Sequence, residues 1–148
     1  KIIGTHFFNP VPVMKLVEII KGFETSEETL QSVQMFCRSI GKETVVCKKD
    51  TQGFITTRLL LAQRAEAFRL LEEGVATVEE IDKAMTLAFK HPLGPFQLAD
   101  LAGLDTGLNA LKAMQETYGD RFKVPTFLKQ MVALGYIGKK SGKGFYDY

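Results

Sequence analysis

A histidine and a glutamate near the beginning of the sequence are of the types that acid–base catalysis needs. His6 ends a β-branched and aromatic stretch, and Glu18 occupies a second such stretch after the turn sequence Asn9–Pro12. A turn of this kind can fold the second stretch back onto the first and bring the two side chains together. A carboxylate bonded to one imidazole nitrogen fixes the tautomer, so that the other nitrogen can take a proton from a hydroxyl group. We therefore predict that His6 and Glu18 form an acid–base pair.

The second stretch, Val13–Lys21, predicts where the glutamate points. Side chains alternate across a strand, so Glu18 shares a face with apolar residues. Val17 and Ile19 lie on the other face between two lysines, and we expect that face to meet solvent. Glu18 should then be buried, which is costly unless the carboxylate is paired. From the pattern alone, a structural His6 and a Glu18 paired with a lysine remain open as alternatives.

The elements that must position this pair form a small strand-and-helix piece. Strands are predicted at 1–8, 13–21 and 44–47. The sequence Thr25–Glu28 has the pattern of a capping box with Thr25 as N-cap, and Gly41 is suited to end the helix. Helical spacing places a set of apolar residues on one face of that helix: Leu30, Val33, Phe36, Cys37 and Ile40.

From Gln52 onward the sequence is typical of helices. Helices are predicted at 55–73, from 77 to about 89 behind a second capping box at Thr77, and at 96–102, 105–118 and 126–134. Glycines 53, 94, 103 and 144 are expected to serve turns or caps. Three strands and one helix are too few to enclose a core, so we expect the chain to be part of a longer one. Its start at Lys1 without a signal peptide agrees with that expectation.

Composition excludes several classes of function. A net charge of +2 with scattered basic residues gives no argument for nucleic acid, and no apolar run reaches the ~20 residues of a membrane span. Cys37 and Cys47 lack metal-ligand spacing and are predicted to be small buried side chains, although a disulfide stays open. A reducing, cytoplasmic setting is the preferred interpretation.

Four segments, in order along the chain, resemble signatures of the 3-hydroxyacyl-CoA dehydrogenase family. The first, Gly4–Glu18, is long and specific. The others are Asp50–Ile55 with Arg58, then His91–Phe96 followed by Asp100, Gly103, Leu104 and Asp105, and finally Gly138–Tyr146. The resemblance implies an α+β, mostly α part-chain. Residues 1–49 would be the last strands and a helix of a Rossmann-type NAD-binding domain, and residues 50–148 an all-α C-terminal helical domain.

The resemblance also implies an activity. The family oxidises L-3-hydroxyacyl-CoA to 3-ketoacyl-CoA with NAD, and His6 falls on its catalytic base and Glu18 on the carboxylate that orients it. Asn9 falls on a polar residue beside the substrate and nicotinamide. The expected partners are an acyl-CoA substrate and a second copy bound through the helical domain, where Leu59, Leu60, Leu61, Leu70 and Leu71 offer apolar surface.

Two departures qualify the resemblance. Thr57 stands where the family usually has an Asn that helps to hold the substrate, so Thr57 is only a weak site residue. No Gly-x-Gly-x-x-Gly occurs in a strand-to-helix setting, so NAD would be bound mainly by a part outside this sequence and the chain alone should be inactive. The alternatives are a related hydroxy-acid or sugar-acid dehydrogenase, or a helical module used only for dimerisation.

Overall fold

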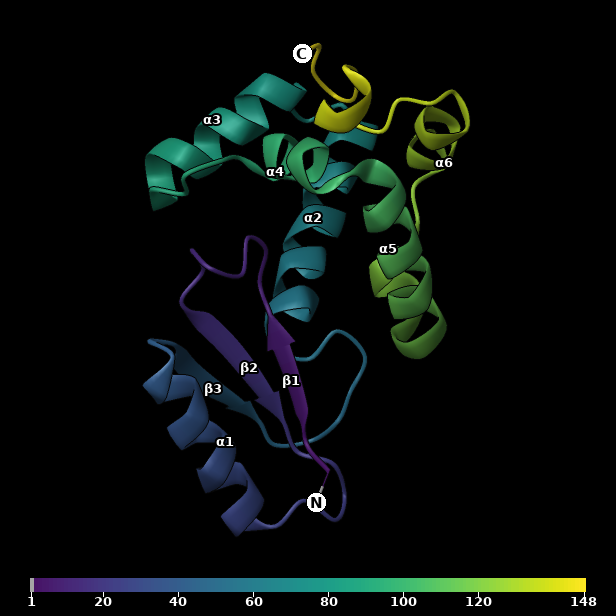
Figure 1. Ribbon diagram of the computed structural model, residues 1–148. Coiled ribbons are helices and arrows are strands. Elements are labelled where there is room, and N and C mark those ends of the chain that lie inside the picture. The colour runs from purple at the N-terminus through teal and green to yellow at the C-terminus, as the bar shows by residue number, and fades with distance from the viewer. Residues whose placement is uncertain (1) are drawn as a thin grey trace. The chain divides into compact units, whose positions relative to one another are not determined.

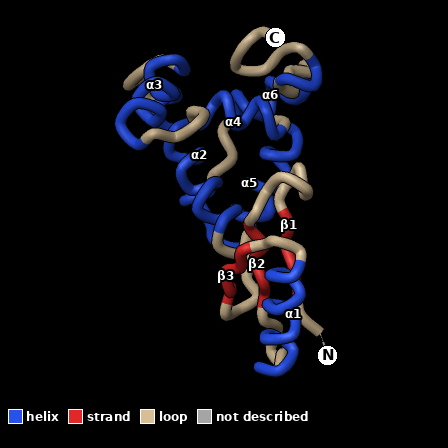
Figure 2. The backbone as a smooth tube through the Cα atoms, turned by 60° about the vertical axis from the view of Figure 1, so that its left-hand side comes forward, coloured by secondary structure: helices blue, strands red, loops and turns tan. Residues whose placement is uncertain are grey.

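The computed structural model describes residues 2–148; Lys1, with which the predicted first strand begins, lies outside the described residues. The chain forms two compact units, Lys1–Ile55 and Thr56–Tyr148. The strands belong to the first unit, and the second is built from helices (Figures 1 and 2). The predicted fold class, a mixed first piece followed by helices, is confirmed.

The first unit is a three-stranded sheet with one helix. Its elements are β1 (Gly4–Phe7), β2 (Leu16–Ile20), α1 (Glu27–Ser39) and β3 (Glu43–Cys47). The strand order is β1-β2-β3, with β1 antiparallel and β3 parallel to β2. Because β2 and β3 are parallel, the chain must cross over between them, and α1 is that crossover. Figure 2 shows α1 lying along the sheet.

Several boundaries differ from the sequence prediction. Among the described residues, only Gly4–Phe7 of the strand predicted at 1–8 is a strand. Local hydrogen bonds explain two other differences. The second strand begins at Leu16 rather than Val13, because the backbone N–H groups of Val13 and Met14 both donate to the Pro10 carbonyl and close a turn. The N-cap of α1 is Ser26 rather than Thr25: the Ser26 hydroxyl accepts the Thr29 N–H at 3.2 Å. The Thr25 hydroxyl instead accepts the Gly22 N–H and donates to the Ile2 carbonyl, so it closes the preceding turn.

The expectation that one face of β2 meets solvent was wrong. Val17 and Ile19 are fully buried and pack in one cluster with Leu30 and Cys37 of α1. Apolar burial against the helix outweighs the lysines at the ends of the stretch. The predicted apolar face of α1 is therefore largely confirmed, but two of its members, Phe36 and Ile40, lie exposed.

The second unit packs around α2. Its elements are α2 (Thr56–Glu72), α3 (Val78–Phe89), α4 (Pro95–Ala102), α5 (Leu104–Tyr118), η1 (Gly119–Phe122), α6 (Thr126–Ala133) and η2 (Lys139–Ser141). All five helices predicted after Gln52 are present within a residue or so, whereas the two short 3₁₀ turns were not predicted. The capping box at Thr77 is confirmed, with Glu80 bonded back to the Thr77 N–H. Phe68, Phe96 and Leu111 lie at the centre of the core.

Two buried carboxylates tie this unit together. Asp82 of α3 accepts the N–H groups of Phe96 and Gln97 at the start of α4, at 2.8 and 2.9 Å. Asp100 of α4, completely buried, accepts the N–H groups of Phe145 and Tyr146 at 3.0 Å and thereby holds the C-terminal tail. A buried charge must be satisfied by hydrogen bonds of this kind.

The leucines proposed as dimer surface divide into two groups. Leu61 is buried in the core, and Leu70 and Leu71 pack against it, so these three serve the unit's own interior. Leu59 is 67% exposed, and Leu60 is partly exposed. Among the described residues, no helix has the length and hydropathy that crossing a membrane requires. Cys37 and Cys47 are buried free thiols, as expected.

Candidate active site

The two residues singled out for acid–base chemistry are partners in the sheet. His6 of β1 and Glu18 of β2 are directly opposed in the antiparallel register. Directly opposed residues point to the same face with their Cβ atoms ~5 Å apart. The Nδ1 atom of His6 lies 2.8 Å from Oε2 of Glu18. The structure thus contains the predicted contact.

Glu18 is held in a fixed position. Its side chain is completely buried, as the alternation along the strand predicted. One carboxylate oxygen, Oε2, meets the imidazole, and the other, Oε1, accepts the backbone N–H of Ile55 at 3.0 Å. Hydrogen bonds to both oxygens offset the cost of burying the charge and define the plane of the carboxylate.

The Ile55 N–H reaches Glu18 because of a tight turn. The Phe54 N–H donates to the Thr51 carbonyl at 3.0 Å, and Gly53 and Phe54 have φ values of 77° and 46°. Glycine adopts this left-handed conformation freely, whereas an aromatic residue does so rarely. The sequence analysis treated Gly53 as a turn glycine and did not identify Phe54 or the Ile55 N–H; no side-chain pattern signals a backbone donor.

The imidazole is bordered by two aromatic rings. The ring centroid of Phe8 lies 4.5 Å and that of Phe54 lies 5.8 Å from the His6 ring. The His6 side chain keeps 32% of its surface exposed. The contact with Glu18 uses Nδ1, so the second ring nitrogen, Nε2, is not part of it. The arrangement is a partly exposed imidazole anchored by a buried carboxylate through one of its two nitrogens.

The two other predicted site residues are Asn9 and Thr57. Asn9 is exposed in the turn that follows β1, three residues beyond His6. Thr57 belongs to the other unit, in the first turn of α2, and is partly exposed. The structure thus brings His6 and Glu18 together within the first unit. Asn9 belongs to the same unit, and Thr57 belongs to the helical unit.

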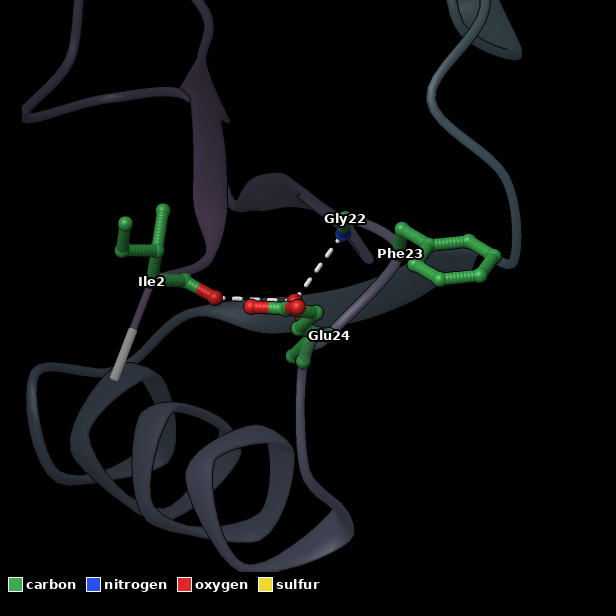
Figure 3. Close-up of a pocket in the computed structure, with 5 residues that line it drawn as sticks. Ile2, Gly22, Phe23 and Glu24 are labelled. Carbon is green, nitrogen blue, oxygen red and sulfur yellow. Dashed lines mark hydrogen bonds between the residues drawn. The ribbon is translucent and has the colours of Figure 1, made fainter.

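A hollow of about 470 Å³ lies beyond the other end of β1 and β2 and is lined by Ile2, Gly22, Phe23, Glu24 and Thr25 (Figure 3). The Thr25 hydroxyl joins the Gly22 N–H to the Ile2 carbonyl there. Among the described residues that line it, Glu24 is the one with an ionisable side chain. Neither His6 nor Glu18 is among these described lining residues.

Family models match both parts of the chain. Residues 53–148 match the family model described as 3-hydroxyacyl-CoA dehydrogenase, C-terminal domain, and residues 1–51 match that for the NAD binding domain of the same enzyme. The chain belongs to the 3-hydroxyacyl-CoA dehydrogenase family. The resemblance noted in the sequence is therefore confirmed.

Individual relatives of this family member are similar over the whole chain. A probable 3-hydroxybutyryl-CoA dehydrogenase of Bacillus subtilis is 47% identical over 149 residues, which cover 100% of this chain and 52% of the relative. The crystal structure of the (S)-3-hydroxybutyryl-CoA dehydrogenase of Ralstonia eutropha is 44% identical with a TM-score of 0.93, covering 99% of this chain and 52% of that one. A diketoreductase structure is 30% identical with a TM-score of 0.82, covering 99% and 51%. The chain spans about half the length of the relatives it matches.

Proposed function

We propose that the enzyme carrying this chain is an NAD-dependent L-3-hydroxyacyl-CoA dehydrogenase and that His6 is its general acid and base, oriented by Glu18. The observation that supports this most directly is the 2.8 Å contact between His6 Nδ1 and the buried Glu18 carboxylate. That contact leaves Nε2 as the nitrogen that meets the substrate. Membership of the family supports the substrate class.

The proposed chemistry is a proton transfer matched to a hydride transfer. Nε2 of His6 takes the proton of the 3-hydroxyl group and an imidazolium forms. Glu18 stabilises this imidazolium through its hydrogen bond with Nδ1. Bound NAD supplies the acceptor for the hydride that leaves the same carbon. In the reverse direction, the His6 imidazolium donates its proton to the oxygen of a 3-ketoacyl group as that oxygen becomes an alkoxide.

Two further residues are proposed to help in binding. Asn9, exposed beyond β1, offers an amide donor and acceptor to the substrate and nicotinamide. Thr57 offers a hydroxyl where a longer amide is usual, so its part in holding the substrate is minor. These groups suit the nicotinamide end of NAD; the glycine-rich cradle for its pyrophosphate does not occur in this sequence.

The test follows NADH oxidation with acetoacetyl-CoA for the enzyme that carries this chain and for its His6→Gln variant. Turnover by the parent that is lost in the variant supports both the reaction class and the base. The chain by itself, without the glycine-rich motif, is the negative control and should show no turnover. Absence of turnover of acetoacetyl-CoA by the parent enzyme would contradict the proposal.

A second candidate function is the reduction of a carbonyl compound that carries no CoA. The diketoreductase similarity supports it, since that protein shares the fold over the whole chain. Free hydroxy acids and gulonate-type substrates, assayed beside acetoacetyl-CoA, discriminate the two. A preference for the free acids in kcat/KM would favour the second candidate.

We also propose that the helical unit mediates a homodimer. In this proposal dimerisation is one role of a chain that also carries the catalytic pair, and not its only role. Apolar side chains that a solitary unit would leave in water lie on its surface: Leu59 67%, Val75 64%, Leu87 72%, Phe89 67% and Leu134 69% exposed. Large apolar side chains that gather on a surface favour an interaction site, and Leu87 and Phe89 belong to the same helix, α3. Analytical ultracentrifugation that shows only monomer at micromolar concentration would rule the dimer out. If the dimer forms, the double variant Leu87→Lys with Phe89→Lys should weaken it in the same measurement.

A further inference from the structure

The turn at Thr51–Ile55 brings two groups to the His6–Glu18 pair from outside the sheet. The Ile55 N–H donates to Glu18 Oε1 at 3.0 Å, and the Phe54 ring lies 5.8 Å from the His6 ring at a tilt of 56°. The two members of the pair come from β1 and β2, whereas this turn follows β3. It therefore constrains the pair independently of the strand register.

The backbone of this turn is strained at Phe54. Its φ of 46° lies in the left-handed region, which aromatic side chains rarely adopt. A glycine at this position would remove the strain, yet a phenylalanine occupies it directly beside Gly53. Strained non-glycine residues persist where the surrounding structure fixes them and concentrate at functional sites. Here the fixed features are the Thr51–Phe54 turn bond and the ring's place beside His6.

Each group has a distinct effect on the pair. An N–H donor at Oε1 favours the ionised carboxylate and stops it from rotating about its last bond. Oε2 then stays aimed at Nδ1, which keeps the proton on that nitrogen and the lone pair on Nε2. The Phe54 ring, together with Phe8, limits rotation of the imidazole itself.

We infer that Phe54 and Ile55 are positioning residues: the Ile55 N–H and the Phe54 ring hold the Glu18 carboxylate and the His6 imidazole in the orientation that proton transfer requires. Neither group touches the reacting atoms, since both act through Glu18 and His6. The inference rests on the proposed function for its kinetic consequence only. The tautomer of His6 tests it without any assay of turnover.

The experiment records the ¹⁵N signals of the His6 ring in this chain above neutral pH. The sequence has two histidines, so the His91→Gln variant assigns the signals. One variant replaces the Ile55 amide by an ester, which removes the donor and keeps the side chain. Phe54→Gly relaxes the turn and removes the ring, and Phe23→Gly, in the exposed loop of Figure 3, is the matched control.

In the parent and in Phe23→Gly, the proton should sit on Nδ1. In the ester variant and in Phe54→Gly, a second tautomer with the proton on Nε2 should appear. In the enzyme that carries the chain, kcat should fall by about 10- to 100-fold with little change in KM, as expected for losing a hydrogen bond to a charged group.

A folded ester variant with the parent's tautomer and kcat would overturn the inference. If the ester variant does not fold, Phe54→Gly is the deciding variant. A Phe54→Gly variant with the parent's tautomer and the parent's kcat would also overturn the inference. The two proposals can fail separately. If the parent is inactive with acetoacetyl-CoA but the two variants show the second tautomer, the proposed function is contradicted and the positioning role is supported.

Discussion

His6 and Glu18 are directly opposed residues of two antiparallel strands, with Nδ1 of the first 2.8 Å from Oε2 of the second. Strand register thus brings the two side chains together on one face of the sheet. A slip of one residue would turn Glu18 to the face that packs on α1. Val17 and Ile19 oppose that slip, because it would remove them from the apolar cluster that they form with Leu30 and Cys37 of α1.

The first prediction concerns the charge of Glu18. Glu18→Gln keeps the shape of the side chain but removes the negative charge that stabilises the imidazolium, so kcat should fall by about 100-fold or more in the enzyme that carries this chain. KM should change little, because Glu18 does not contact the substrate. Steady-state kinetics check this beside Glu24→Gln, a change in an exposed loop of the same unit. Equal kcat values for the two variants would contradict the orienting role.

A second prediction concerns Asp100, whose carboxylate accepts the N–H groups of Phe145 and Tyr146 from the C-terminal tail. Asp100→Ala leaves buried donors without acceptors and should lower the free energy of unfolding by about 3 kcal/mol. Urea unfolding monitored by circular dichroism measures the change. Asp147→Ala, an exposed carboxylate of the same tail, is the control. An Asp100→Ala midpoint equal to that of the control would mean that the tail docks without this carboxylate.

Periodicity and motifs predicted the helices, the strands and the meeting of His6 with Glu18, because those features depend on residues close together in the sequence. They did not predict that Val17 and Ile19 are buried, since that depends on where α1 packs. They also missed the Ile55 N–H at Glu18 and the tail at Asp100, residues 37 and 45 positions apart. A backbone donor carries no residue-type signature, so only the three-dimensional structure reveals it.

The third prediction concerns alkaline pH. Burial and the charge and hydrogen bond of Asp100 raise the pKa of Tyr148 from 10.0 to about 12, and burial and Asp82 raise the pKa of Tyr146 as well. The neutral phenol is favoured in the folded chain, so this stabilisation is complete below pH 10 and is lost as pH rises towards 12. Because Tyr148 is about half exposed, the effect should be small.

The test of that prediction compares thermal melts of the parent and Tyr148→Phe across this range. The difference in Tm between the two should shrink as pH rises from 10 to 12. Arg64 has the opposite effect on stability. Burial lowers its pKa to about 10, so the cost of burying its charge falls as the side chain loses its proton at high pH. Its contribution is common to both proteins and cancels in the difference. A difference that stays constant would argue against the Tyr148–Asp100 hydrogen bond.

The last prediction concerns the close approach of the tail to α4. The sequence identifies Gly144 only as a turn or cap glycine, yet a methyl group at this position would overlap the Asp100 carboxylate. Gly144→Ala should therefore push the tail away and destabilise the helical unit by about 1–3 kcal/mol. Gly22→Ala is the matched control, since the nearest atom to its added methyl is the Thr25 hydroxyl oxygen at 3.5 Å, an ordinary contact. Thermal unfolding measures stability, and limited proteolysis after Lys143 reports whether the tail is released. Parent-like melting and protection of the Gly144→Ala variant would show that the tail is not seated on Asp100.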